Sequence, residues 1–340
     1  MSSLQIGVDL AKSVFEVALS PVPGQVRARR RLSRAGVTPF FAQQPPAEVL
    51  LEACGSAHHW GRELQRLGHR VALLPPREVA RYRAGTKTDR ADAKALLEAA
   101  RNADLHRVPV KSIEQQAVVA LHRLRQGYLR TRTARINALR GHLREFGFVI
   151  PVGARHVRPR AHAALAADAV PAFLRPALQQ VLEDIGTLED QAEAVRTQLT
   201  ALAEQMPDVQ RLLTVPGVGI LTATALVAFV GDIHRFRSGR HLAAWLGLTP
   251  REHSSGAVRR LGRITKHGNT YLRMLLIHGA RSALRAGGGS RQPDDLRTWA
   301  RAVAARRTHN VAAVALANKL ARVCWRVWRD QRPFVRRDAR

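Results

Sequence analysis

The chain has 340 residues, of which 46% are hydrophobic and 5% aromatic, so we expect about two or three domains with cores of Ala, Val and Leu. Lys and Arg total 55 against 26 Asp and Glu, and the net charge of +29 indicates a polyanionic partner such as nucleic acid. The two cysteines match no zinc or disulfide pattern, and no signal peptide or membrane span is evident, so we expect a cytoplasmic protein without a membrane partner.

Residues 1–108 predict a mixed α/β domain. Strand-like apolar runs occupy residues 4–10, 14–19, 48–54 and 71–74, and residues 25–33 are expected to form a further strand with Arg alternating on an exposed face. An amphipathic helix is expected at 57–67, and Pro75 and Pro76 stop the strand that follows it. Alternation of strands and helices favours a layered fold around a sheet.

Acidic side chains interrupt the apolar pattern of this domain. Asp9 lies inside the first strand, on the same face as Gly7, and Glu52 lies inside the run VLLEAC. An unpaired carboxylate in an apolar strand is unfavourable, so each of these two acids needs a cation or hydrogen-bond donors. Asp89 and Asp92 are three residues apart at the start of a helix, which places both on one face.

Four carboxylates from two strands and a helix form the oxygen-only ligand set that a site for two Mg²⁺ ions needs, and Mn²⁺ is expected to substitute. Two such ions activate an attacking oxygen and stabilise a leaving one in phosphoryl transfer. The alternative is that Asp89 and Asp92 are surface acids at a helix N-terminus. Side chains close to the acids in sequence are candidate nucleic-acid contacts: Lys12, Lys87 and Arg90, with Tyr82 and Arg83 as further candidates.

Residues 109–206 predict a helical arm. Apolar side chains recur near heptad spacing through an Arg-rich helix over 112–145, and a second long helix is expected over 170–205. The stretch 151–162 between them is rich in Pro, Gly, Arg and His and is expected to be a loop. Two long helices joined by a loop favour an antiparallel coiled coil, with a plain helical layer as the alternative.

Residues 207–285 predict a mainly helical, glycine-rich unit. The sequence LLTVPGVGILTATAL indicates two apolar helices joined by a tight turn, a helix-hairpin-helix-like motif in which Gly217 and Gly219 are candidate phosphate contacts. An ordinary turn with glycine after the first helix is the alternative. Residues 286–340 are expected to form a flexible linker at 286–295, followed by a basic helical tail.

A polar loop is expected at 250–268, before a helix over 270–284. It contains Ser254 and Ser255 among basic side chains. A serine hydroxyl is a weak nucleophile that needs activation, so a plain turn is the alternative role of this loop. The candidate nucleic-acid contacts in and beside the loop are Arg251, Arg259, Arg260, Arg263, Lys266 and Asn269.

The chain resembles the insertion-sequence one-ten family of transposases in five segments, which are GVDLAKSVFEVAL, LLEACGSAHHWGRELQRLGHRVALLPP, GTKTDRADAKALLEAAR, LLTVPGVGILTATALVAFVGD and LAAWLGLTPREHSSG…LGRITKHGNTYLRMLL. They follow the order and spacing of the family, and the serine loop is closer to its one-eleven-eleven branch. The resemblance implies an N-terminal domain with a RuvC-like, ribonuclease-H-like fold, whose metal ligands are Asp9, Glu52, Asp89 and Asp92.

The same resemblance implies a serine that attacks a DNA phosphodiester, with Ser254 favoured and Ser255 as the fallback. It also implies donor and target DNA as substrates, a bridge RNA that guides the protein to them, a homo-oligomer (dimer or tetramer), and action on the bacterial nucleoid. We therefore expect an enzyme that cuts and rejoins DNA. The alternatives are a Holliday-junction-type endonuclease that uses water as its nucleophile, and a non-catalytic nucleic-acid-binding protein.

Overall fold

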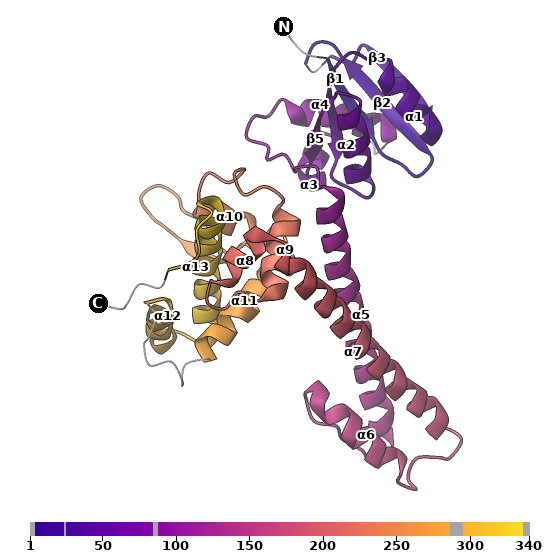
Figure 1. Cartoon of the computed structure of the whole chain (residues 1–340), viewed down its shortest axis with the longest axis vertical. Helices are drawn as coiled ribbons and strands as arrows, with labels where there is room; N and C mark the ends of the chain where they lie inside the picture. Colours follow the sequence, from indigo (N-terminus) through magenta and orange to yellow (C-terminus); the bar gives the residue numbers. More distant parts are fainter. Residues whose placement is uncertain (1–3, 24, 84–87, 286–294, 336–340) are drawn as a thin grey trace. The chain divides into compact units, whose positions relative to one another are not determined.

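The computed structural model describes residues 4–23, 25–83, 88–285 and 295–335. The chain separates into two compact units, Met1–Gln116 and Ala117–Arg340, which Figure 1 draws in indigo to magenta and in magenta to yellow. Lys87 and nearly all of the predicted linker at 286–295 lie outside the described residues. None of the helices in the described ranges combines the length and the hydropathy needed to cross a lipid bilayer.

A five-stranded mixed sheet forms the centre of the first unit. Its strands are β1 (Gln5–Asp9), β2 (Val14–Ser20), β3 (Ala28–Ser33), β4 (Glu48–Glu52) and β5 (Arg70–Leu74). They lie in the order β3-β2-β1-β4-β5, in which β1, β2 and β3 pair antiparallel while β4 and β5 run parallel to β1. The strands predicted from the sequence are thereby confirmed, as is the mixed α/β class.

Helices cover both faces of this sheet. On one face, α1 (Val37–Ala42) and α2 (Ala57–Arg66) share a core with the side chains of Val8 and Leu51. On the other face, α3 (Pro76–Val79) and α4 (Asp89–Ala100) share a core with Leu50. Because strand side chains alternate, the residues that neighbour Val8 and Leu51 in each strand point toward α4.

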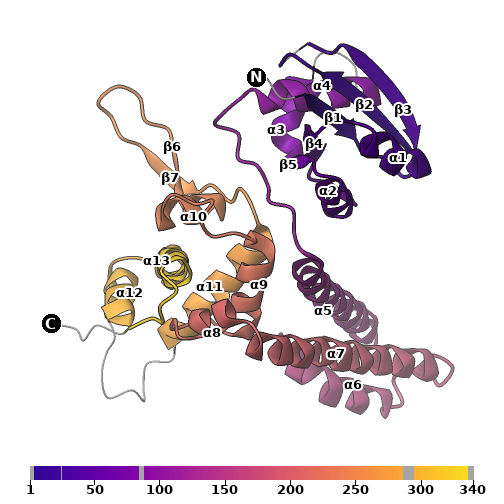
Figure 2. The same ribbon diagram turned by 45° about the horizontal axis from the view of Figure 1, so that its top comes forward.

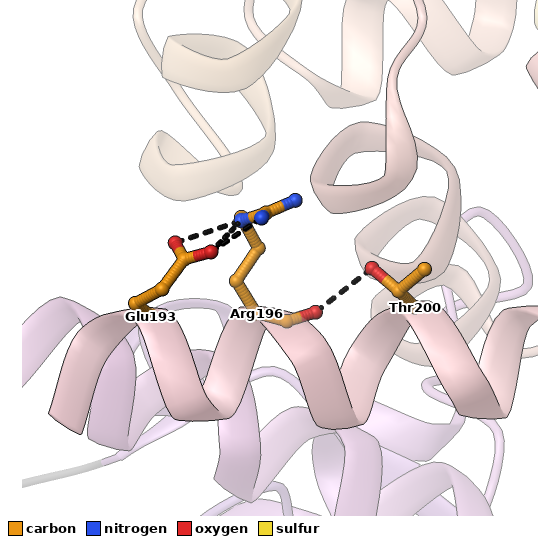
Figure 3. Close-up of polar contacts among 3 residues, drawn as sticks. All are labelled: Glu193, Arg196 and Thr200. Carbon is orange, nitrogen blue, oxygen red and sulfur yellow. Dashed lines mark hydrogen bonds and ion pairs between the residues drawn. The ribbon is translucent and has the colours of Figure 1, made fainter. Parts of the chain in front are cut away.

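Two long helices, α5 (Ile113–Glu145) and α7 (Arg175–Glu204), confirm the helices predicted in the arm. Apolar side chains of both helices meet in one core, made by Ile136, Leu139 and Leu143 of α5 with Leu178, Leu182 and Ile185 of α7. An ion pair between Arg132 and Glu189 also joins them, at 3.2 Å. On the exposed side of α7, Arg196 donates hydrogen bonds to the Glu193 carboxylate at 2.8 and 2.9 Å, and the Thr200 hydroxyl donates to the Arg196 carbonyl (Figure 3).

The prediction of a loop at 151–162 was wrong, because this stretch contains most of helix α6 (Val157–Leu165). One face of α6 is apolar and packs into the core of the arm through Val157, Ala161, Ala164 and Leu165. Its content of Pro, Gly, Arg and His suggested a loop. Pro159, however, lies in the first turn of α6, where proline is tolerated because its missing N–H would have no helical partner.

The glycine-rich residues 207–285 and the C-terminal segment together form a body of helices around one core. Its helices are α8 (Pro207–Leu213), α9 (Ile220–Val230), α10 (Gly239–Trp245), α11 (Thr270–Arg285), α12 (Asp295–Arg306) and α13 (His309–Arg329). α8 and α9 flank the PGVG turn as predicted. α13 supplies Leu316, Leu320, Cys324 and Trp328 to the core, so the C-terminal segment folds together with the helices before it.

The polar stretch 250–268, expected to be a loop, instead contains a β-hairpin. Strands β6 (Pro250–Glu252) and β7 (Leu261–Ile264) pair antiparallel, and Figure 2 shows them extending outward from the helices of the unit. The side chains of both strands are largely exposed, so hydrophobic periodicity gave no signal for them.

Candidate active site

Asp9 and Glu52 are the last residues of β1 and β4, two neighbouring parallel strands. Val8 pairs with Leu51 in their register, so the next residues along the two strands, Asp9 and Glu52, are side by side. Strand alternation points both acids toward α4, because Val8 and Leu51 face the opposite helices. The structure thus brings the two strand carboxylates together at one edge of the sheet.

The N-terminus of α4 brings the other two acids to the same edge. Thr88 caps the helix, and its hydroxyl accepts a hydrogen bond from the Ala91 N–H at 3.2 Å. Asp89 is exposed at the first helical position, and Asp92 is buried one turn later. Gly7 permits this approach, since a Cβ at Gly7 would lie 2.5 Å from a backbone carbonyl oxygen of α4.

The four carboxylates interact electrostatically. Burial, followed by the charges of Asp92, Asp89 and Glu52, raises the pKa of Asp9 from 3.8 to about 6. A raised pKa means that the site favours whatever neutralises its negative charge, either a proton or a cation. The acids predicted as one set therefore do lie within reach of one another's charges.

The donor set has the chemistry that Mg²⁺ prefers, because all four side chains offer only carboxylate oxygens. Within the described residues, no three acidic, His or Cys side chains already converge on a common point for a metal ion. Arg83, one of the candidate nucleic-acid contacts, instead donates a hydrogen bond to the Asp92 carboxylate. This hydrogen bond occupies Oδ1 of Asp92, so the other carboxylate oxygen is the one left for a metal ion.

The predicted basic contacts near the acids that the structure describes, Lys12 and Arg90, are both exposed. Lys12 is exposed in the turn after β1, and Arg90 is exposed at the start of α4. The backbone carbonyl of Arg90 accepts a hydrogen bond from Arg29 of β3 at 3.0 Å, which links the edge strand of the sheet to α4.

The base of the serine hairpin is fixed to the helical core. The buried Arg273 of α11 donates to the carbonyls of Leu246 and His267, both at 2.9 Å, one on each side of the hairpin. Gly268 has a φ of +74°, and a Cβ there would lie 1.8 Å from the Trp245 carbonyl oxygen. These contacts hold the base of the hairpin in place while its tip is exposed.

At the tip, the Ser254 hydroxyl is held between two groups. Its Oγ donates to Glu252 Oε1 at 2.7 Å and accepts from the backbone N–H of Arg260 at 3.2 Å. The guanidinium of Arg259 lies 3.5 Å from the same Glu252 oxygen. Ser255 forms backbone hydrogen bonds with Val258 across the turn, at 3.1 and 3.3 Å. The two candidate nucleophiles therefore differ: the side chain of Ser254 forms hydrogen bonds, whereas the bonds of Ser255 are made by its backbone.

Sequence reasoning missed Glu252 as part of this arrangement. The signal that could have found it is strand alternation, because Glu252 and Ser254 are two residues apart and so share one side of an extended segment. The predicted contacts Arg251, Arg259, Arg260, Arg263 and Lys266 are all exposed. The side chain of Asn269 accepts from the Leu272 N–H at 3.0 Å, so it caps α11.

The two glycines of the PGVG turn have different surroundings. Gly217 has a φ of +82°, and a Cβ there would lie 2.7 Å from the carbonyl oxygen of Gly279 in α11, so its place is one of close packing. Gly219 precedes α9 and is exposed, and a Cβ there would meet no described atom within 4 Å. Of the pair, Gly219 is the one open to a phosphate.

Comparison with known proteins shows which family the chain resembles. Residues 6–148 match the DEDD-type transposase family of IS110 elements, and residues 209–294 match the transposase IS116/IS110/IS902 family. A probable family 20 transposase of Pseudomonas aeruginosa is 44% identical over 328 residues, which are 96% of each chain. The transposase for insertion sequence element IS1111A of Coxiella burnetii is 40% identical over 333 residues, 97% of this chain and 90% of its own length.

A shorter match reaches a pilin gene-inverting protein of Moraxella lacunata, at 32% identity over 127 residues, 37% of this chain and 38% of that protein. Together these matches define an enzyme that cuts and rejoins DNA. The chain belongs to the IS110 family of transposases. The family expected from the sequence is thereby confirmed.

Proposed function

We propose that this transposase uses two groups in one DNA strand-transfer reaction, the four carboxylates of the first unit and the Ser254 hydroxyl of the second. The observation that carries the proposal is the set of acids that the sheet and α4 place around Asp9, where burial and then the neighbouring carboxylates raise the pKa of Asp9 to about 6. The sheet order β3-β2-β1-β4-β5, in which the neighbours β1, β4 and β5 run parallel, is consistent with a ribonuclease-H-like fold of the RuvC kind.

Asp9, Glu52, Asp89 and Asp92 would hold Mg²⁺, for which Mn²⁺ would substitute. The metal, when bound, supplies positive charge beside the phosphodiester. Ser254 would attack the phosphorus atom and form a phosphoserine ester, which conserves the energy of the broken bond for rejoining. The exposed position of Ser254 at the hairpin tip leaves its hydroxyl accessible to a DNA strand.

Exposed positive charge near both of the proposed reacting groups supports nucleic-acid partners. Exposed arginines surround Ser254, Lys12 and Arg90 are exposed near the acids, and Gly219 is open at the start of α9. We include a bridge RNA beside donor and target DNA because the resemblance to the family implies one, and a net charge of +29 is compatible with more than one nucleic-acid partner. We further propose a homo-oligomer, dimer or tetramer, assembled through a coiled coil of α5 and α7, acting on the nucleoid in the bacterial cytoplasm.

Trapping of a covalent protein–DNA adduct tests this function. The probe is a nicked duplex made from the DNA that flanks the coding sequence, together with RNA transcribed from that flank and Mg²⁺. We expect a denaturation-resistant adduct with the unaltered chain and with Ser255→Ala, and none with Ser254→Ala. Cleavage without an adduct, retained in Ser254→Ala, would instead identify an endonuclease that uses water.

A further inference from the structure

The Ser254 hydroxyl has an acceptor already in place. Its 2.7 Å bond to Glu252 Oε1 is of ordinary length for a hydroxyl donating to a carboxylate. An ionised carboxylate only accepts hydrogen bonds, so the serine proton lies between the two oxygens. Ser254 Oγ also accepts a hydrogen bond, from the backbone N–H of Arg260 at 3.2 Å.

We propose that Glu252 is the general base that activates Ser254, an inference that rests on the serine-nucleophile function proposed above. Attack on phosphorus requires the hydroxyl to lose its proton, and a base must be within hydrogen-bond reach of that proton. Glu252 satisfies this requirement in the folded chain, because Ser254 follows β6 by two residues and its hydroxyl lies 2.7 Å from Glu252 Oε1. The Arg260 N–H then stabilises the negative charge that develops on Ser254 Oγ.

The Ser254 O–H bond breaks and its proton moves to Glu252 Oε1, while an oxygen lone pair forms the Oγ–P bond. One bridging P–O bond of the DNA breaks, and the departing sugar oxygen leaves with the electron pair and takes a proton from water. In rejoining, a sugar hydroxyl gives its proton back to the solvent and its oxygen forms a bond to the phosphorus atom. The Oγ–P bond of the phosphoserine breaks, and protonated Glu252 returns its proton to the departing serine oxygen.

The guanidinium of Arg259, 3.5 Å from Glu252, gives this carboxylate a partner other than the serine. The competing view is therefore that Glu252 only shapes the hairpin through its ion pair. The two roles differ in what Gln at this position can do: Gln retains the size and the hydrogen-bond acceptor but accepts no proton at neutral pH. Glu193 provides a matched control, because it is an exposed glutamate held by an arginine three residues away and far in sequence from any serine hydroxyl of the hairpin (Figure 3).

The test measures the rate of adduct formation on the nicked duplex described above. We expect Glu252→Gln to slow it by about 100-fold or more, which is the usual contribution of a general base. Glu193→Gln should leave the rate unchanged, and both variants should melt at the temperature of the unaltered chain because both glutamates are exposed.

A second variant separates base from scaffold. Glu252→Ala removes the carboxylate and leaves room at an exposed position, so added sodium formate can take its place. We expect formate to accelerate adduct formation by Glu252→Ala at least about tenfold, while sodium chloride at equal ionic strength does not. If Glu252 were purely structural, formate would not change the rate of adduct formation by Glu252→Ala.

The outcomes distinguish this inference from the function on which it rests. An adduct lost in Ser254→Ala but formed at the normal rate by Glu252→Gln overturns the role of Glu252 and leaves the serine nucleophile standing. A slow Glu252→Ala that formate fails to accelerate also overturns it. An adduct that maps to Ser255, or no adduct with the unaltered chain, overturns both.

Discussion

Among single residues, Asp9 carries the largest electrostatic penalty of the candidate site. Its pKa is raised to about 6, so the folded chain holds this proton more tightly than the unfolded chain does. The stability that protonated Asp9 contributes is complete below pH 3.8 and is lost as the pH rises toward 6. At neutral pH the ionised side chain is therefore destabilising.

We predict that Asp9→Asn stabilises the metal-free protein at pH 7 by about 1–2 kcal/mol, a value reduced for the partial exposure of the site, and abolishes DNA joining. Thermal unfolding at pH 7 and at pH 4 measures the first effect, and the gain should shrink at the lower pH. Mg²⁺ should raise the melting temperature of the unaltered chain more than that of Asp9→Asn. An equal gain at both pH values would show that ionisation of Asp9 is not its cause.

His122 is a second titrating group with a defined environment. It is fully buried in α5, and its ring nitrogens lie 3.0 Å from the Tyr271 hydroxyl and 3.1 Å from the Thr224 hydroxyl. The Thr224 hydroxyl donates to the Ile220 carbonyl, so it accepts from His122 Nε2–H and Nδ1 accepts from Tyr271. Burial, followed by the charge of Arg125, lowers the pKa of His122 to about 4.

A lowered histidine pKa gives stability that is complete above pH 6.5 and is lost as the pH falls toward 4, because only the unfolded chain takes up the proton in that window. We predict a loss of about 3 kcal/mol over this range. His122→Gln should be less stable at neutral pH but should lose less on acidification. Denaturant unfolding at pH 7 and pH 4.5 compares the two proteins, and parallel losses would refute the assignment.

Among the secondary-structure elements, the site depends on the close approach of β1 and α4. At Gly7 a methyl group would meet the Ala93 carbonyl oxygen at 2.5 Å, and a helix backbone cannot yield locally. We predict that Gly7→Ala destabilises the first unit by about 1–3 kcal/mol and shifts the Asp89–Asp92 turn away from Asp9, with loss of activity. Thermal unfolding and adduct yield measure the two effects.

Gly141 provides the opposite case for comparison. It is exposed in α5, and a Cβ there meets no described atom within 4 Å. Gly141→Ala should therefore stabilise the protein by about 0.5–1 kcal/mol through helix propensity. If Gly7→Ala and Gly141→Ala lost similar amounts of stability and adduct yield, packing at Gly7 would not control the site.

The same elements show what a sequence can predict. The strands and long helices were predictable because burial imposes a period of two or 3.6 on apolar residues. The proximity of the four acids was predictable because Asp9 and Glu52 interrupt apolar strands and Asp89 and Asp92 share one face of a helix. The Arg83–Asp92 contact and the Glu252–Ser254 pair depend on folded geometry, and the exposed strands of the hairpin have no apolar period. Helix α6 was missed because composition outweighed its apolar face.

For the whole molecule, positive charge governs association with nucleic acid. Each Lys or Arg that contacts a phosphate adds about one unit to the salt dependence of binding. We predict that the double variant Arg259→Gln, Arg260→Gln weakens binding to duplex DNA and reduces the slope of log affinity against log salt by about 2. The control Arg66→Gln removes one positive charge, from a residue that is paired with Glu63, and should leave the slope unchanged. Equal slopes for all three proteins would remove the hairpin from the nucleic-acid interface.

The central claim is that carboxylates in one unit and a serine in the other serve one reaction. The most direct measurement is mass spectrometry of the peptides from a trapped protein–DNA adduct, made with the unaltered chain and with Asp9→Asn. We predict a nucleotide attached to Ser254 in the unaltered chain and no modified peptide in Asp9→Asn. A nucleotide on another residue, or the same yield of modified Ser254 in Asp9→Asn, would contradict the claim.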